Sequence, residues 1–233
     1  MINIEELLSR SKEIGYELSR KQAEMLDCYA EMLVEANRTV NLTRIDTPDE
    51  MLEKHFADCL YACKHIDNGE KVADVGCGAG FPGMVIAIAC NAHVTFIDSV
   101  GKKLSFISDV CNELGIEAQF INERAEVIGR NPDQRDRYDY VTARAVARLN
   151  TLIEYCSPLV KVGGKFIAMK GKDADIEVDE VENASNELKC KITDSERYTV
   201  NGDEQRSIIV FEKFEATPEI YPRTTKKISK QPL

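Results

Sequence analysis

A glycine-rich segment about a third of the way along the chain has the residue types of a ligand-binding loop. Residues 72–83, with the sequence VADVGCGAGFPG, join one apolar stretch to the apolar run at 84–89. Glycine adopts positive φ values and lets a ligand approach the backbone closely, and proline is favoured in the first turn of a helix. We therefore predict that Gly76, Gly78 and Gly80 form a turn from a strand into a helix, with a ligand at the carboxyl end of that strand.

Two nucleotide cofactors fit this loop. Residues 78–83 satisfy the GxGxxG pattern of dinucleotide-binding proteins. Asp98 ends the next apolar run, where a carboxylate can accept hydrogen bonds from the ribose hydroxyls of NAD or of S-adenosylmethionine. Asp74 favours S-adenosylmethionine, because a carboxylate suits its cationic amino acid end, directly or through water, and repels a pyrophosphate. NAD remains the alternative.

The elements around the loop predict an α/β fold. Short β-branched runs alternate with helical segments from Lys71 onward, which indicates a mostly parallel sheet. Strands are expected at residues 71–75, 93–98, 118–121, 138–142, 165–169, 197–200 and 207–211. Helices are expected at residues 84–90, 102–114, 149–160 and 175–188. The last two strands flank the turn residues 201–203 and form a hairpin. This arrangement resembles the Class I, Rossmann-like methyltransferase fold, which implies a mostly parallel seven-stranded sheet whose last strand is antiparallel.

Residues 1–66 are predicted to be a helical extension that precedes a Rossmann-like domain at 67–233 with a basic tail. Ser19 and Gln22 have the spacing of a capping box. The apolar residues that follow share one helical face and are expected to pack on the core: Met25, Leu26, Tyr29, Met32 and Leu33. A second helix is expected to start at Thr47, with Pro48 in its first turn and Glu50 closing a capping box.

Charge and composition restrict the function. A net charge of −10 argues against a protein that coats nucleic acid indiscriminately. The tail, residues 221–233, nevertheless carries only positive charges, and it supplies candidate RNA contacts at Arg223, Lys226, Lys227 and Lys230. No apolar run is long enough to span a membrane, and a signal peptide is not expected, so a cytoplasmic location is predicted. The eight scattered cysteines predict free thiols, and no metal site is expected.

Several motifs in order give the chain a family resemblance. They are NLTRI at 41–45, KHFAD at 54–58, the glycine loop, DS and KK at 98–103, TARA at 142–145, MKG at 169–171, YPR at 221–223 and KQPL at 230–233. In this combination the chain resembles the RsmG family, also called GidB. The resemblance implies methylation of N7 of one guanine in 16S ribosomal RNA, with S-adenosylmethionine as donor. It also implies that Gly76, Phe81, Ala125, Glu126 and Arg144 form the cofactor site.

The chain departs from the family pattern at a few positions. Ala143 and Cys59 stand where serine is common, and Cys77 replaces threonine or serine in the loop. None of these is a predicted cofactor residue. An NAD-dependent oxidoreductase and an RNA-binding module without activity remain as alternatives.

The implied chemistry needs no catalytic base. Guanine N7 has a free lone pair, so catalysis is expected to come mainly from holding the reacting atoms in line. Arg144 follows a strand and is the candidate catalytic residue, whereas Lys170 is a candidate RNA contact. His55 and Asp58 lie one helical turn apart and are expected to pair with each other. The predicted partner is 16S rRNA in the small ribosomal subunit, with no membrane and no obligate protein partner.

Overall fold

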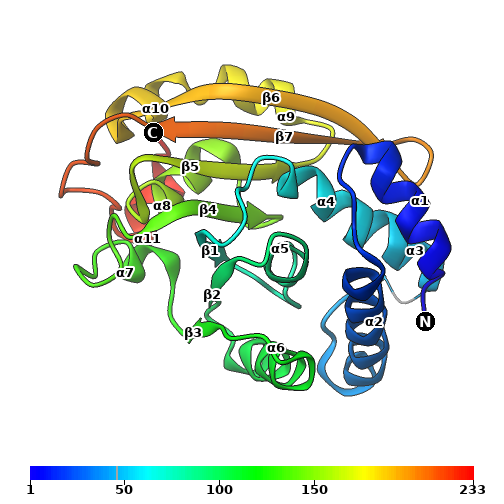
Figure 1. Cartoon of the computed structure of the whole chain (residues 1–233). Coiled ribbons are helices and arrows are strands. Elements are labelled where there is room, and N and C mark those ends of the chain that lie inside the picture. The colour runs from blue at the N-terminus through cyan, green and yellow to red at the C-terminus, as the bar shows by residue number, and fades with distance from the viewer. Residues whose placement is uncertain (46) are drawn as a thin grey trace.

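The computed structural model describes residues 1–45 and 47–233. These residues form one seven-stranded sheet with helices packed around it (Figure 1). The strand order is β3-β2-β1-β4-β5-β7-β6. The bounds of the strands are β1 (Lys71–Val75), β2 (His93–Ile97), β3 (Gln119–Ile121), β4 (Tyr138–Arg144), β5 (Val160–Lys170), β6 (Cys190–Val200) and β7 (Glu204–Lys213). Strand β7 runs antiparallel to both of its neighbours, and the other pairs are parallel. The carboxyl ends of the parallel strands therefore meet at one edge, where such sheets bind ligands.

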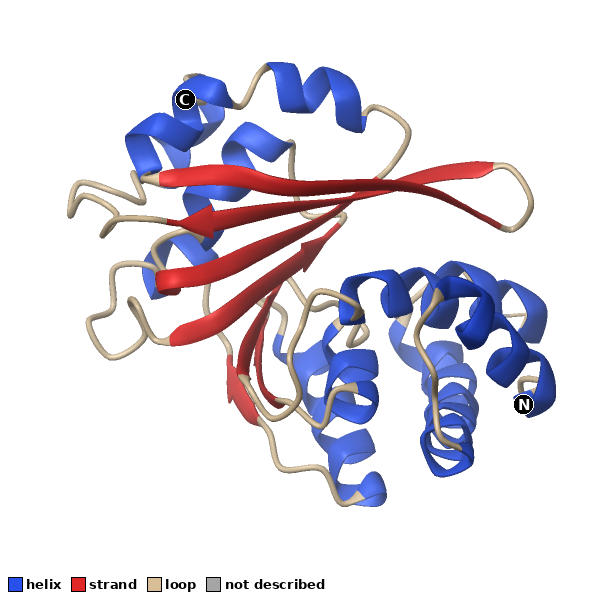
Figure 2. Cartoon of the chain, turned by 45° about the horizontal axis from the view of Figure 1, so that its top comes forward, coloured by secondary structure: helices blue, strands red, loops and turns tan. Residues whose placement is uncertain are grey.

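Helices cover both faces of the sheet (Figure 2). One face carries α1 (Ile4–Ile14), α2 (Arg20–Val40), α3 (Pro48–Met51), the π-helix η1 (Leu52–Ala57), α4 (Asp58–Cys63), α5 (Gly83–Ala89) and α6 (Gly101–Leu114). The other face carries α7 (Ala125–Ile128), α8 (Leu149–Cys156), α9 (Ala174–Asp179), α10 (Glu182–Leu188) and α11 (Thr225–Lys230). In the described part of the chain no helix is both long and apolar enough to cross a membrane.

Alternation along the strands decides which side chains face the N-terminal helices. In β1, Val72 packs in the core formed with α1, α2 and α4–α6, whereas Ala73 packs in the core on the opposite face. Tyr140 and Val141 divide in the same way in β4. Successive strand residues point to opposite faces, so Asp74 and Arg144 lie on the side of the N-terminal helices.

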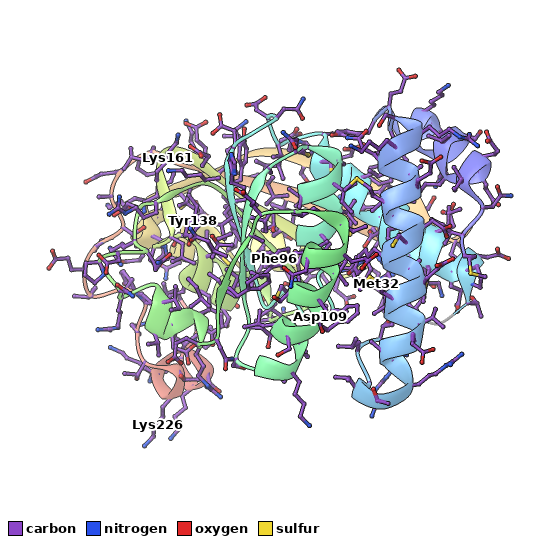
Figure 3. The ribbon with its side chains drawn as sticks, turned by 60° about the horizontal axis from the view of Figure 1, so that its bottom comes forward. Met32, Phe96, Asp109, Tyr138, Lys161 and Lys226 are labelled. Carbon is purple, nitrogen blue, oxygen red and sulfur yellow. The ribbon has the colours of Figure 1, made fainter. Side chains whose placement is uncertain are left out.

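The N-terminal helices pack as predicted. Ser19 and Gln22 form the capping box that starts α2, and the apolar face of α2 is buried at Leu26, Tyr29 and Leu33. Met32, on the same helix, packs at the edge of this core (Figure 3). These helices share one hydrophobic core with α5 and α6. The division of the chain at residues 66 and 67 stays a prediction.

Several element bounds differ from those expected. The acidic segment 175–188 forms two helices, because Val181 turns into the core and interrupts it. Strands β6 and β7 are longer than predicted, since the hairpin pairs polar edge residues as well as apolar ones. The helix expected at 149–160 ends at Cys156, and the short helices α7 and α11 were not predicted. The hydroxyl of Thr47 bonds Glu50 rather than the helix backbone. All eight cysteines are free thiols, as predicted.

Candidate active site

The glycine loop forms the predicted turn between β1 and α5. Gly76, Gly78 and Gly80 have φ values of 69°, 59° and 106°, in the left-handed region that favours glycine. A Cβ added at Gly78 would meet nothing closer than a carbonyl oxygen at 3.9 Å. A Cβ at Gly80 would lie 2.9 Å from the hydroxyl of Tyr29. Gly78 therefore borders open space, whereas Gly80 permits close packing against helix α2.

A cavity of about 330 Å³ lies beside this loop, and we call it the loop cavity. Its lining brings together four of the predicted cofactor residues, which are Gly76, Asp98, Ala125 and Glu126. Asp98 Oδ2 accepts a hydrogen bond from the backbone N–H of Gly78 at 3.0 Å. The end of β2 is thus tied to the loop that follows β1, as expected for adjacent parallel strands.

Asp74 lies beneath the loop rather than on its surface. Its carboxylate is fully buried and accepts hydrogen bonds from the backbone N–H of Gly83 at 2.9 Å and from the Thr142 hydroxyl at 3.3 Å. Burial raises the pKa of Asp74 to about 7. The structure therefore shows Asp74 joining the start of α5 to the sheet, because strand alternation turns it inward. Its expected contact with the cofactor stays a prediction.

Phe81 is buried, and its side chain points toward the N-terminal helices. Its ring stacks on His55 with centroids 4.1 Å apart and lies 5.2 Å from the ring of Tyr29. The Tyr29 hydroxyl donates to the carbonyl of Ala79 in the loop at 2.6 Å. Tyr29 was expected only to pack in the core. The sequence did offer one indication of this contact, because a tyrosine on a buried helix face needs a hydrogen-bond partner for its hydroxyl.

Arg144, at the end of β4, is held by a buried network. Its guanidinium donates to Asp58 Oδ2 at 2.9 Å, to the carbonyl of Lys54 at 3.1 Å and to His55 Nδ1 at 3.1 Å. Asp58 also accepts a hydrogen bond from the hydroxyl of Tyr198 at 2.7 Å. The expected pairing of His55 with Asp58 is therefore wrong, because both side chains bind Arg144 instead.

These contacts fix the tautomer of His55. A guanidinium has no acceptor, so Nδ1 must accept from Arg144, and Nε2 carries the proton that it donates to the Thr43 hydroxyl at 3.0 Å. Burial, together with the Arg144 cation, lowers the pKa of His55 to about 3. His55 is a neutral structural group at physiological pH, and its nitrogens are both occupied.

We expect His55 to make the fold sensitive to acid. The folded state keeps His55 neutral, whereas the unfolded chain protonates it below a pKa of about 6.5, so acid favours unfolding. The free energy of unfolding should fall as the pH drops from about 6.5 towards 3. Urea titrations at several pH values measure this. A His55→Gln variant should lose part of the dependence, and identical pH profiles for the two proteins would contradict the assignment.

A second cavity, of about 820 Å³, lies next to Arg144, and we call it the Arg144 cavity. Its lining mixes cations with carboxylates, so its charges are largely paired. Lys54 Nζ lies 2.8 Å from Glu204, and Lys170 Nζ lies 2.7 Å from Glu177. The predicted RNA contact Lys170 thus lines a cavity at the edge where the carboxyl ends of the parallel strands meet, although its ammonium group already has a partner.

The structure separates the basic residues of the tail into two groups. Arg223 binds the fully buried carboxylate of Glu154, with Nη2 at 2.6 Å from Oε2, so its guanidinium already has a structural partner and its phosphate contact stays a prediction. Lys226, Lys227 and Lys230 are exposed on α11. Figure 3 shows Lys226 pointing away from the rest of the molecule. The three lysines remain candidate RNA contacts.

Across residues 1–45 and 47–233, no three His, Cys, Asp or Glu side chains are arranged to hold a metal ion.

The strand order, the antiparallel β7 and the glycine loop at the end of β1 define a Class I S-adenosylmethionine-dependent methyltransferase. Solved structures share this fold. A geranyl diphosphate methyltransferase in complex with GPP and sinefungin is 13% identical, with a TM-score of 0.59, covering 84% of this chain and 100% of that chain. A geranyl diphosphate C-methyltransferase from Streptomyces coelicolor A3(2) is 14% identical, with a TM-score of 0.55, covering 67% and 78%.

The chain belongs to the GidB family, described as rRNA small subunit methyltransferase G, whose model matches residues 22–209. A ribosomal RNA small subunit methyltransferase G from Lactobacillus johnsonii is 43% identical over 94% of this chain and 95% of its own length. One from Desulfitobacterium hafniense is 42% identical over 98% of each. The predicted fold class, family, cofactor and rRNA methyltransferase function are confirmed. The oxidoreductase that the loop alone allowed is disfavoured.

Proposed function

We propose that this chain transfers a methyl group from S-adenosylmethionine to N7 of a guanine in 16S rRNA of the small ribosomal subunit. Family membership supports the rRNA substrate. The observation that carries the cofactor assignment is the loop cavity, which Asp98 lines while it binds the N–H of Gly78, a glycine that borders open space. We further propose that the protein acts in the cytoplasm without an obligate protein partner.

The residues of the loop cavity suit S-adenosylmethionine, and each would hold a different part of it. Gly76, Gly78 and Gly80 form the turn beside the cavity, with open space at Gly78, and Asp98 can accept hydrogen bonds from ribose hydroxyls. Ala125 and Glu126 follow β3 and line the same cavity, where they would contact the adenine. Arg144, Phe81 and Asp74 lie on the face of the N-terminal helices, and we expect the amino acid end of the cofactor to be directed toward that face.

The bound cofactor supplies an electrophilic methyl group on a sulfonium. The chain itself has to orient guanine N7 toward that methyl and keep water away, because N7 loses no proton when it is methylated. Correct positioning can contribute on the order of 7 to 11 kcal/mol. Hydrogen bonds to Asp58, His55 and the carbonyl of Lys54 hold the side chain of Arg144 in one position, where it lines the Arg144 cavity. We propose this cavity as the place of the target guanine.

The RNA strand would meet few unpaired cations near the cavity. Lys54 and Lys170 are both paired with carboxylates there. Lys226, Lys227 and Lys230 on α11 are exposed and offer phosphate contacts. RNA affinity should therefore depend on a small local patch and fall with added salt, although the whole chain is acidic.

Methyl transfer to isolated small subunits and to naked 16S RNA, with radiolabelled S-adenosylmethionine, tests the proposed function. We expect incorporation into at least one of them, and calorimetry should detect binding of S-adenosylmethionine but not of NAD. Cofactor binding without incorporation into either RNA would favour an inactive RNA-binding module. Tight NAD binding without S-adenosylmethionine binding would refute the cofactor assignment.

A Tyr29→Phe variant tests how the N-terminal helices support the loop. The change removes the hydrogen bond to the buried carbonyl of Ala79 and should cost about 1 kcal/mol of unfolding free energy. Because the loop loses an anchor, the dissociation constant for S-adenosylmethionine should rise several-fold. Met32→Leu, on the same helix, is the matched control and should leave cofactor affinity unchanged. Equal affinities of the two variants for S-adenosylmethionine would show that Tyr29 contributes packing alone and does not support the loop.

A further inference from the structure

The C-terminal segment lies beside α7 and α8 (Figure 1) and is bound by two arginines of the segment that follows α7. Arg130 Nε donates to the carbonyl of Pro222 at 2.7 Å. Arg135 Nη1 donates to the carbonyl of Tyr221 at 2.8 Å. Both arginines therefore bind backbone carbonyl groups of the tail.

Close packing and a buried ion pair also hold the C-terminal segment in place. A Cβ added at Gly129, just after α7, would lie 2.9 Å from Cγ of Pro222, so the tail touches the end of α7 directly. One residue further, Arg223 forms its ion pair with the buried Glu154 of α8. The start of α11 is thereby held in a defined position, which is unusual for a chain terminus.

At that position the tail reaches a predicted cofactor residue. The hydroxyl of Thr225, the first residue of α11, donates to Oε1 of Glu126. Arg124 approaches the same oxygen at 3.4 Å. Within the described ranges both hydrogen bonds to the Glu126 carboxylate go to Oε1, and Glu126 lines the loop cavity while being almost fully buried. The carboxylate is thus held through one oxygen, and Oε2 can accept from a ligand.

We propose that Thr225 positions the carboxylate of Glu126 for S-adenosylmethionine, so that the C-terminal segment is part of the cofactor site as well as a candidate RNA surface. This inference rests on the proposed role of Glu126. A side chain held in its bound orientation loses less conformational freedom when the ligand binds, and affinity rises accordingly. The lysines of α11 are exposed, so the same short helix has one contact with the cofactor site and a separate charged surface.

The test compares the cofactor and RNA affinities of five variants. Thr225→Val keeps the shape but removes the hydroxyl, and it should raise the dissociation constant for S-adenosylmethionine about tenfold. Thr225→Ser restores a hydroxyl and should recover the parent value to within about twofold. Glu126→Gln should weaken cofactor binding, and adding Thr225→Val to it should cause no further loss, since the two act through one contact. The triple variant Lys226→Ala, Lys227→Ala, Lys230→Ala should raise KM for the RNA and leave the dissociation constant for S-adenosylmethionine unchanged.

The outcomes separate this inference from the proposed function. Unchanged cofactor affinity in Thr225→Val, with weakened affinity in Glu126→Gln, would overturn the role of Thr225 and leave the cofactor site intact. Normal affinity in Glu126→Gln would overturn both the role of Thr225 and the assignment of Glu126. A loss in Thr225→Val that serine does not rescue would show that only packing of the tail matters, which also contradicts the proposal. Thermal melts confirm that each variant is folded.

Discussion

A Gly78→Val variant should lose measurable binding of S-adenosylmethionine while its far-ultraviolet circular dichroism stays close to that of the parent chain. The space beyond Gly78 is open, so the valine side chain fits the fold but occupies room that the cofactor needs. The backbone also has φ of +59°, which costs a residue with a side chain about 1 to 2 kcal/mol. Calorimetric titration with S-adenosylmethionine measures the loss.

Gly115→Val is the matched control for this prediction. Gly115 ends α6 with φ of +66°, and a Cβ there meets nothing within 4 Å. The two variants therefore have similar backbone strain, but only Gly78 lies in the glycine loop, where its N–H binds Asp98 of the loop cavity. Gly115→Val should lose stability and keep cofactor affinity. Cofactor binding that survives in Gly78→Val would refute the assignment of the loop.

Replacing Arg144 with methionine should have the largest effect on stability. Asp58 is buried and would lose its ion-pair partner, with the hydroxyl of Tyr198 as its remaining partner among the contacts described above. Breaking a buried ion pair from one side costs about 3 to 5 kcal/mol of unfolding free energy. Urea unfolding measures this cost. Methyl transfer should also fall, because the wall of the Arg144 cavity is lost.

Two comparisons separate the buried pair from an ordinary ion pair. Arg148→Met breaks a pair with Glu180 in which the side chains are 57% and 46% exposed, and it should change stability by less than about 1 kcal/mol. The double variant Arg144→Met, Asp58→Asn removes the uncompensated charge and should be more stable than Arg144→Met alone. Equal losses in Arg144→Met and Arg148→Met would contradict the buried network.

The part of the site that could be predicted from the sequence is the part that depends on local order. Glycines between a strand and a helix define a turn whatever the rest of the chain does, and Asp98 at the end of the next strand follows from the parallel arrangement. The loop, its edge of the sheet and the position of Asp98 were therefore predictable. Tyr29 was predictable only as a buried residue, because its partner Ala79 lies 50 positions away.

The unpredicted features depend on which groups meet across the fold. Arg144 and Asp58 are 86 positions apart, and Arg223 and Glu154 are 69 apart, so the sequence cannot show that these charges pair. The sequence does not distinguish the basic residues of the tail from one another, but Arg223 forms a buried ion pair that holds the tail on the fold. In the same way, the inward direction of Asp74 follows from the register and alternation of β1, which only the assembled sheet defines.

The most direct measurement maps the transferred methyl group on 16S rRNA by mass spectrometry, after small ribosomal subunits lacking the modification react with this protein and S-adenosylmethionine. The account predicts one product, a guanine methylated at N7, and no product with the Gly78→Val variant. A methyl group on a ribose hydroxyl, on a different base or on another atom of guanine would contradict the proposed reaction, even if cofactor binding were normal.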